Sequence, residues 1–143
     1  MKIAIGADHA GFDYKEKLVP FLTSQGFEVE DFGTFSTASV DYPDFAHPLA
    51  TSVEGGENEL GILICGSGNG VALTANKHQG IRAGLCWLDE LGALARQHNN
   101  ANVLCMGARV IGPELAFRIA DTFLDSKFSN DERHIRRISM LED

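Results

Sequence analysis

Several features that define particular protein classes are scarce or missing in this sequence. Its three cysteines are odd in number and far apart along the chain, so neither a disulfide framework nor a cysteine-based zinc site is expected. No apolar run approaches the ~20 residues that a membrane span requires, and the N-terminus carries no signal-peptide pattern. Twelve basic against twenty acidic side chains give a net charge of −8, which disfavours binding to nucleic acid or to an anionic membrane. We therefore expect a cytoplasmic protein with free thiols.

The hydrophobic pattern along the 143-residue chain is typical of an alternating α/β fold. Hydrophobic residues make up 44% of the chain and charged residues 22%, and the length favours one domain over residues 1–143. Strands are predicted over residues 2–6, 27–31, 60–65, 81–86 and 102–106. Helices are predicted over residues 12–25, 43–53, 71–77, 89–98, 113–124 and 132–141. This alternation predicts a three-layer α/β/α sandwich with a five-stranded parallel, Rossmann-like sheet.

Polar side chains of interest lie close to the ends of several predicted elements. An open parallel sheet binds ligands beyond the carboxyl ends of its strands. The first strand leads to Asp8 and His9, and the third ends at Cys65, before a glycine-rich loop. We also expect the loop that contains His98 and Asn99, at the end of the fourth strand–helix unit, to lie at this edge. The sequence thus predicts that these groups converge on one site.

The loop from Gly66 to Gly70 reads Gly-Ser-Gly-Asn-Gly between a buried-looking strand and a helix. Consecutive backbone amides at a helix N-terminus bind anions, and they stabilise an oxyanion that develops during a reaction. The same composition also suits a tight strand–helix turn that needs positive φ angles. Neither a P-loop nor a dinucleotide-binding motif fits, because no Gly-Lys-Ser/Thr follows and the glycine spacing differs.

Cys65 directly precedes this loop, where the positive end of the following helix favours a thiolate. A thiolate there can attack as a nucleophile or remove a proton beside a carbonyl group. The structural alternative is a small cysteine of the core. Cys86 and Cys105 also lie near strand ends but have no such loop, so a core position is expected for both.

Three further histidines differ in what their sequence surroundings indicate. His98 is expected at the end of its helix, either as an acid–base group or as a capping residue. His47 and His78 have no supporting sequence neighbours, and no role is assigned to them.

Arg133 and Arg137 are four residues apart and share one helix face, where two guanidinium groups can grip a phosphate. The alternative is a solvated face that pairs with nearby carboxylates. Arg109, in the loop after the fifth strand, is a third candidate ligand for a small anion.

Taken together, these residues resemble the type B ribose-5-phosphate isomerases, within the wider family that includes the galactose-6-phosphate isomerase subunits. The matching segments occur in the family's order and span residue 3 to about residue 137. They are Gly-Ala-Asp-His-Ala-Gly at 6–11, Asp-Tyr-Pro at 41–43, Ile-Cys-Gly-Ser-Gly-Asn-Gly at 64–70, Ala-Asn-Lys at 75–77, Arg-Gln-His-Asn at 96–99, Gly-Ala-Arg-Val-Ile-Gly at 107–112, and Arg133-His134 with Arg137.

The resemblance implies an aldose–ketose isomerase without metal or other cofactor, which interconverts ribose 5-phosphate and ribulose 5-phosphate through a cis-enediolate. Cys65 matches the general base, His98 matches the residue that opens the sugar ring, and Asp8 and Ser67 match groups that assist them. The residues that match substrate ligands are Asp8, His9, Tyr42, Gly66, Ser67, Gly68, Asn69, Gly70, Asn99, Arg109, Arg133 and Arg137. The resemblance also implies a homodimer with shared active sites, or a tetramer of paired dimers, in which the C-terminal helix at about 131–142 contacts the partner subunit.

Details of the sequence bear on the substrate. Val71 stands where some members carry a glutamate base, so Cys65 has no rival for that role. The His-Asn and Arg-His-x-x-Arg signatures are both present, which favours a pentose phosphate over the galactose branch. Trp87 departs from the smaller or more polar loop expected there, so a six-carbon phosphate such as allose 6-phosphate or galactose 6-phosphate is an alternative substrate. A non-catalytic phosphosugar-binding protein and a thiol-dependent hydrolase are the alternatives from other functional classes.

Overall fold

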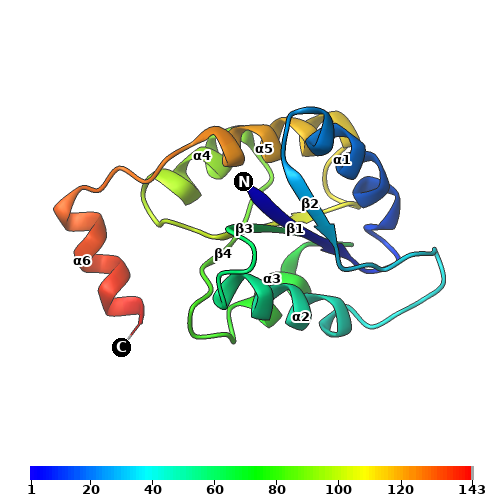
Figure 1. Cartoon of the computed structure of the whole chain (residues 1–143), viewed down its shortest axis with the longest axis horizontal. Coiled ribbons are helices and arrows are strands. Elements are labelled where there is room, and N and C mark those ends of the chain that lie inside the picture. Colours follow the sequence, from blue (N-terminus) through cyan, green and yellow to red (C-terminus); the bar gives the residue numbers. More distant parts are fainter. Residues whose placement is uncertain (143) are drawn as a thin grey trace.

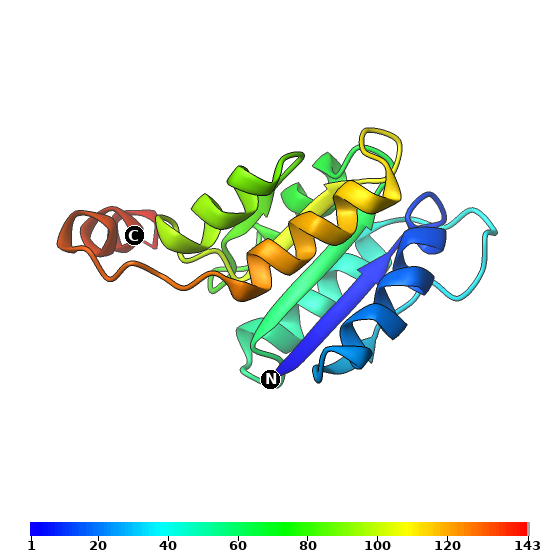
Figure 2. The same ribbon diagram turned by 90° about the horizontal axis from the view of Figure 1, so that it is seen from above.

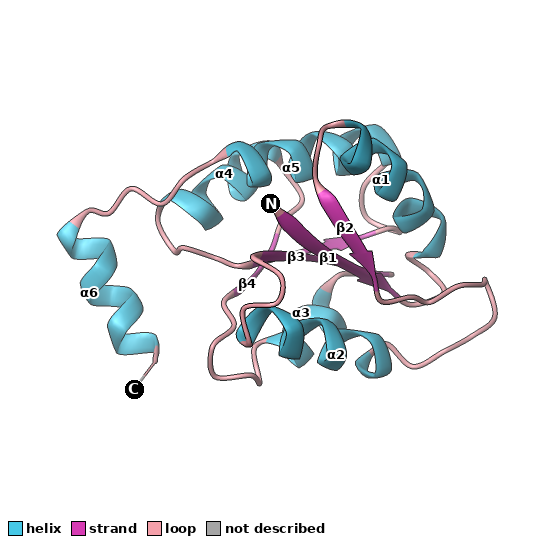
Figure 3. Cartoon of the chain, in the orientation of Figure 1, coloured by secondary structure: helices cyan, strands magenta, loops and turns pink. Residues whose placement is uncertain are grey.

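The computed structural model describes residues 1–142, which form a parallel α/β fold (Figures 1 and 3). The strands are β1 (Lys2–Ala7), β2 (Glu28–Asp31), β3 (Leu60–Cys65), β4 (Ala83–Leu85) and β5 (Val103–Gly107). All strand pairs are parallel, in the order β2-β1-β3-β5-β4. The helices are α1 (Phe12–Ser24), α2 (Pro43–Glu54), α3 (Asn69–Ala75), α4 (Asp89–Gln97), α5 (Pro113–Asp125) and α6 (Glu132–Leu141). The predicted sandwich with a five-stranded parallel sheet is confirmed.

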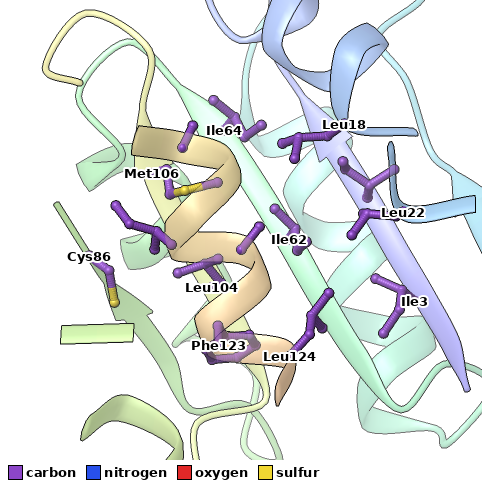
Figure 4. Packing of buried hydrophobic residues seen from close by; sticks show 14 of the residues in the cluster. Ile3, Leu18, Leu22, Ile62, Ile64, Cys86, Leu104, Met106, Phe123 and Leu124 are labelled. Carbon is purple, nitrogen blue, oxygen red and sulfur yellow. The ribbon is translucent and has the colours of Figure 1, made fainter. Parts of the chain in front are cut away.

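Helices cover both faces of the sheet, and each face has its own hydrophobic core. Helices α1, α4 and α5 lie on one face, and α2 and α3 lie on the other (Figure 3). On the first face, Ile3, Ile62 and Leu104 of the strands pack with Leu18 and Phe123 of the helices (Figure 4). Successive side chains of a strand point to opposite faces of the sheet, and here helices cover both faces. Strand β3 is therefore buried along its whole length, as its continuous apolar run predicted.

The boundaries differ from the predictions by a few residues. Strand β4 is only three residues long, where residues 81–86 were predicted, and α3 begins at Asn69, two residues early. Helix α1 contains Pro20 within its length. Strand β2, whose side chains are alternately exposed and partly buried, lies at the edge of the sheet.

Lys15 of α1 carries a charge, yet its side chain is fully buried. Its ammonium group lies 2.7 Å from a carboxylate oxygen of Asp31 on β2 and 3.1 Å from Glu16. The rings of Phe12 and Phe35 lie on the same ammonium, at 5.4 and 5.2 Å from their centroids. This partner on β2 is sixteen residues away in the sequence, so the periodicity of α1 alone does not reveal it.

Removing the carboxylate of this ion pair is expected to cost more stability than removing the lysine. Asp31→Ala leaves the buried ammonium without its main counter-charge and is expected to lower the free energy of unfolding by about 3 kcal/mol. Lys15→Met removes the buried charge itself, and Asp31 is exposed enough to be hydrated, so we expect a loss of about 1 kcal/mol or less. Urea unfolding of the two variants measures the difference, and equal losses would contradict this description of the pair.

The strand order places a crevice between β1 and β3. The chain leaves β1 towards β2 on one side of the sheet and continues with β3 on the other side. Parallel sheets bind ligands beyond the carboxyl ends of the strands at such a reversal of order. The backbone amide of Asp8, just past β1, donates to the carbonyl of Ile64 near the end of β3 at 3.2 Å, which ties the two strand ends together.

Helix α6 stands apart from the rest of the chain, at the end of an extended connection over residues 126–131 (Figures 1 and 2). Its exposed apolar side chains include Ile135, Met140 and Leu141. Within residues 1–142, no helix is both long enough and apolar enough to cross a membrane.

Candidate active site

A cavity of about 550 Å³ opens at the carboxyl ends of β1, β3 and β5. It contains the cysteine and most of the glycine-rich loop that the sequence singled out. The residues that line it are Asp8, Tyr42, Cys65, Gly66, Ser67, Asn69, Gly70, Leu73, Arg109 and Val110. Most of the predicted site residues before position 110 therefore lie around one cavity.

Cys65 is the last residue of β3 and is only 4% exposed. Its sulfur accepts a hydrogen bond from the backbone amide of Gly68, with 3.1 Å between nitrogen and sulfur. Hydrogen bonds from amides to a charged acceptor are stronger than those to a neutral one. The loop therefore provides a thiolate of Cys65 with a donor from the N-cap residue of α3.

Gly68 occupies a position that only glycine fits well. Its φ angle is +83°, and a Cβ atom there would overlap the side chain of Leu85 and lie 2.9 Å from the carbonyl carbon of Met106. Ser67 stabilises the same turn, because its hydroxyl accepts a hydrogen bond from the amide of Asn69 at 3.1 Å. The loop is therefore a tight turn with a positive φ angle at Gly68, and most of its residues line the cavity beside the Cys65 thiol.

Tyr42 closes one side of this loop. Its ring lies so close to Gly70 that a Cβ atom on the glycine would lie 2.6 Å from the ring. Because α3 has no preceding turn, the amides of its first turn, that of Gly70 included, lack helical carbonyl partners. The amide of Asn69 already donates to the Ser67 hydroxyl, so the amide of Gly70 is the one that faces an anion entering the cavity without a hydrogen-bond partner of its own helix.

Asp8 and His9 are held by backbone hydrogen bonds just beyond β1. One carboxylate oxygen of Asp8 accepts from the amides of Ala10 and Gly11, at 2.9 and 3.2 Å. The other oxygen remains available to a hydroxyl group in the cavity. The Nδ1 atom of His9 accepts from the amide of Val40 at 3.2 Å, so the neutral ring carries its proton on Nε2.

Arg109 crosses the loop after β5 and provides the positive charge of the cavity. Its backbone amide donates to the carbonyl of Gly66 at 2.9 Å, and its guanidinium group packs over the same glycine. Arg109 is nevertheless an exposed residue, so the guanidinium group can reach a ligand.

The expectation that the His98 loop lies at this edge of the sheet is wrong. Helix α4 runs back from the end of β4, so the loop after it meets the strands at their amino ends, where Asn102 bonds to Arg82 ahead of β4. Strand β5 separates this loop from Gly107, the register partner of Cys65. The four steps between the five residues of this strand, at ~3.3 Å each, make that separation about 13 Å. Within one chain, His98 and Asn99 are therefore remote from Cys65.

His98 belongs to a second cluster, formed with α6. It is the residue that ends α4, and its ring lies on that of His134, with 4.3 Å between centroids. His134 is buried, and its Nδ1 atom lies 2.8 Å from the hydroxyl of Ser129, a contact that sequence reasoning missed. Arg133 and Arg137 are exposed on the same helix. Four of the predicted site residues thus lie at the other end of the molecule: His98, Asn99, Arg133 and Arg137.

The pKa of His134 makes the attachment of α6 sensitive to acid. Loss of solvation lowers this pKa below the usual value of 6.5, and the positive charges of His98 and Arg133 lower it further. Near pH 6 the unfolded segment therefore binds more protons than the folded one, so the contribution to stability is complete above pH 6.5 and falls as the pH drops. We expect amide hydrogen exchange of α6 to be several-fold faster at pH 5.5 than at pH 7.5, after correction for the intrinsic rate. His134→Phe should remove that dependence, and equal protection at both pH values would contradict it.

The other two cysteines are core residues, as predicted. Both are buried, and burial raises the pKa of Cys86 to about 11 and that of Cys105 well above its usual value. They remain neutral thiols near pH 7. All three cysteines are free, as expected from their spacing. Residues 1–142 contain no group of three or more histidine, cysteine or carboxylate side chains arranged to hold a metal ion.

Known proteins of similar sequence are named as sugar-phosphate isomerases. The chain is 46% identical over 140 residues to ribose-5-phosphate isomerase B of Escherichia coli, covering 98% of this chain and 93% of that one. It is 43% identical over 129 residues to a D-erythrulose-4-phosphate isomerase of Pectobacterium atrosepticum, covering 90% of this chain and 85% of that one.

The fold leads to the same group. A crystal structure of a ribose 5-phosphate isomerase from Thermotoga maritima superposes with a TM-score of 0.95 at 50% identity, over 99% of this chain and 97% of that one. The family model described as Ribose/Galactose Isomerase matches residues 3–141. The chain therefore belongs to the ribose/galactose isomerase family, the family that its motifs resemble.

Proposed function

We propose that this protein interconverts D-ribose 5-phosphate and D-ribulose 5-phosphate, with Cys65 as the general base and without a metal. The observation that carries the proposal is the hydrogen bond from the Gly68 amide to the Cys65 sulfur, inside a cavity that also holds Asp8 and Arg109. A thiolate beside free amides has what proton abstraction next to a carbonyl requires: a base, and donors for the oxyanion that forms. The names of the relatives support the same reaction.

The chemistry at Cys65 is a proton transfer between neighbouring carbons. The thiolate removes the proton from C2 of the open-chain aldose, and the electrons of that bond form the C1–C2 double bond as O1 becomes an oxyanion. The amides of the 66–70 loop stabilise this cis-enediolate. The thiol then returns its proton to C1 while the Ser67 hydroxyl helps a proton to move from O2 to O1. Each well-placed oxyanion donor contributes about 10²–10³ in rate.

Residues around the cavity position the rest of the sugar phosphate. The free oxygen of Asp8 accepts a hydrogen bond from a sugar hydroxyl, and the Nε2–H of His9 donates to an oxygen of the substrate. Arg109 provides a charged donor, and Tyr42 and Asn69 border the ligand. Binding energy from a phosphate remote from the reacting carbons orients those carbons against Cys65.

A second copy of the chain would supply the missing ring-opening and phosphate groups. His98, Asn99, Arg133 and Arg137 lie too far from Cys65 to act in the same chain's cavity, yet α6 projects outwards (Figure 2). The cavity has an apolar rim, where Leu73 and Val110 are 68% and 63% exposed, and α6 carries exposed apolar side chains of its own. Such surfaces favour association. We therefore propose a homodimer in which these four residues enter the cavity of the partner subunit.

The candidate substrates of this chain differ in the number of carbon atoms in the sugar. A relative named for a four-carbon ketose phosphate belongs to the same group, so the substrate of this chain is a proposal of its own. Trp87 is the departure from the family's pattern that made six-carbon sugar phosphates alternative substrates. Its side chain is half exposed and is not among the residues that line this cavity within one chain. Ribose 5-phosphate therefore remains the proposed substrate.

Formation of ribulose 5-phosphate from ribose 5-phosphate in excess EDTA tests this proposal. We expect turnover that EDTA does not reduce, and lower kcat/KM values for allose 6-phosphate, galactose 6-phosphate and D-erythrulose 4-phosphate. No turnover of ribose 5-phosphate by folded protein, together with turnover of another of these sugars, would reject the proposed substrate. Binding without turnover of any of them would favour the phosphosugar-binding alternative.

A further inference from the structure

Two histidines to which the sequence assigned no role are direct neighbours in the structure. His47 lies on α2 and His78 in the turn after α3, thirty-one residues away. The Nδ1 atom of His47 is 2.7 Å from the Nε2 atom of His78, and the ring centroids are 5.0 Å apart. His47 is exposed and His78 is half-buried, and neither lines the cavity at Cys65.

Glu54, at the end of α2, fixes the proton positions of this pair. One of its oxygens is 3.5 Å from the Nδ1 atom of His78, and the other accepts from the amide of Gly80 at 2.8 Å. Because Nδ1 of His78 faces a carboxylate, it carries the proton, and the lone pair of Nε2 points to His47.

We propose that His47 and His78 bind a divalent transition metal ion, such as Zn²⁺, Ni²⁺ or Cu²⁺, between these two nitrogen atoms. Neutral imidazole is the usual protein ligand of these ions. At Zn–N distances of about 2.0–2.1 Å, tetrahedral geometry needs the two nitrogens roughly 3.3 Å apart. The pair must therefore open by only about 0.6 Å, which the side chain of the exposed His47 can provide.

Glu54 completes the pattern expected of such a site. A metal-bound histidine nearly always donates its other ring N–H to a carboxylate or carbonyl, which orients the ring and makes it more basic. His78 already has this partner in Glu54, which is in turn held by Gly80. Since no third protein ligand lies in the described part of the chain, water would complete the coordination.

Binding would connect α2 to the turn between α3 and β4 without taking part in isomerisation. The site uses none of the residues assigned to the cavity, so it does not depend on the proposed reaction. An ion bound only by the folded protein stabilises it by mass action. Because protons compete for the same nitrogens, the affinity should be lower in acid than at pH 7.5.

Calorimetric titration of the full chain with ZnCl₂ and NiCl₂ at pH 7.5, without chelator, tests the inference. We expect one ion per chain, a rise in Tm on binding, and loss of both effects in His47→Asn and in His78→Asn. Glu54→Gln should weaken binding by about 10–100-fold, whereas Glu57→Gln, an exposed carboxylate just after the same helix, should not change it. Unchanged stoichiometry and affinity in both histidine variants would overturn the inference.

Cobalt distinguishes this site from the thiol. Co²⁺ bound by imidazole and water has a visible spectrum without a sulfur-to-metal charge-transfer band, and we expect that spectrum. A sulfur band that persists in His78→Asn would place the ion at a cysteine and would also overturn the inference. Isomerase activity of the histidine variants in EDTA should equal that of the wild type. This activity assay reports on the proposed function separately, because metal binding is measured without substrate.

Discussion

Replacing Cys65 with alanine is expected to lower kcat for ribose 5-phosphate by about 10²–10⁴-fold, the range for loss of a general base. Binding of the sugar phosphate should survive, because the substitution leaves in place Asp8 and Arg109, the proposed ligands that line the same cavity. Initial rates measured beside calorimetric binding of a ribose 5-phosphate analogue separate the two effects.

Cys86→Ala is the matched control for this variant. Cys86 is a buried thiol just after β4, which β5 separates from the strand of Cys65, and its raised pKa of about 11 keeps it neutral. Its loss should leave the rate per folded molecule unchanged. Substantial turnover by Cys65→Ala, or an equal loss of rate in Cys86→Ala, would contradict the assignment of the base.

Gly68→Ala is expected to affect both stability and catalysis. The φ angle of +83° disfavours alanine by about 1–2 kcal/mol, and overlap with Leu85 and the Met106 backbone adds about 1–3 kcal/mol. We therefore expect the free energy of unfolding to fall by about 2–5 kcal/mol. The shift of the loop should also move the amide away from the Cys65 sulfur and reduce kcat by at least tenfold.

Gly26→Ala separates the backbone effect from the packing effect. Gly26 has a similar φ angle of +95°, but no other atom lies within 4 Å of the position of an added Cβ. Its substitution should cost only about 1–2 kcal/mol in urea unfolding and should not change the rate. Equal losses of stability in the two variants would show that the Gly68 loop is not tightly packed.

The sequence was sufficient for those parts of the molecule whose contacts are local or regular. The apolar run of β3 predicted a central strand, and the glycine-rich loop after Cys65 predicted a strand–helix turn with exposed amides. The alternation of strands and helices implied a parallel sheet because parallel neighbours need crossover connections. The parallel sheet in turn implied that Asp8 and Cys65 lie at the same sheet edge.

Features that depend on direction or on distant partners were not predictable in the same way. The His98 loop was placed at the wrong edge because a helix that follows a strand reverses the chain direction, so its end lies near the amino ends of the strands. The burial of Lys15 depends on Asp31 of a neighbouring strand, and His47 meets His78 only through the packing of α2 on α3. No spacing within a single element signals such pairs.

The shared active site is tested most directly by mixing two inactive variants. One carries Cys65→Ala and the other carries His98→Ala with Arg137→Ala, and the two are refolded together in equal amounts. If each site combines Cys65 of one subunit with His98 and Arg137 of the other, half of the dimers regain one intact site, and activity should return to about a quarter of the wild-type rate. If activity stays at the level of the separate variants although mixed dimers have formed, the shared site is contradicted.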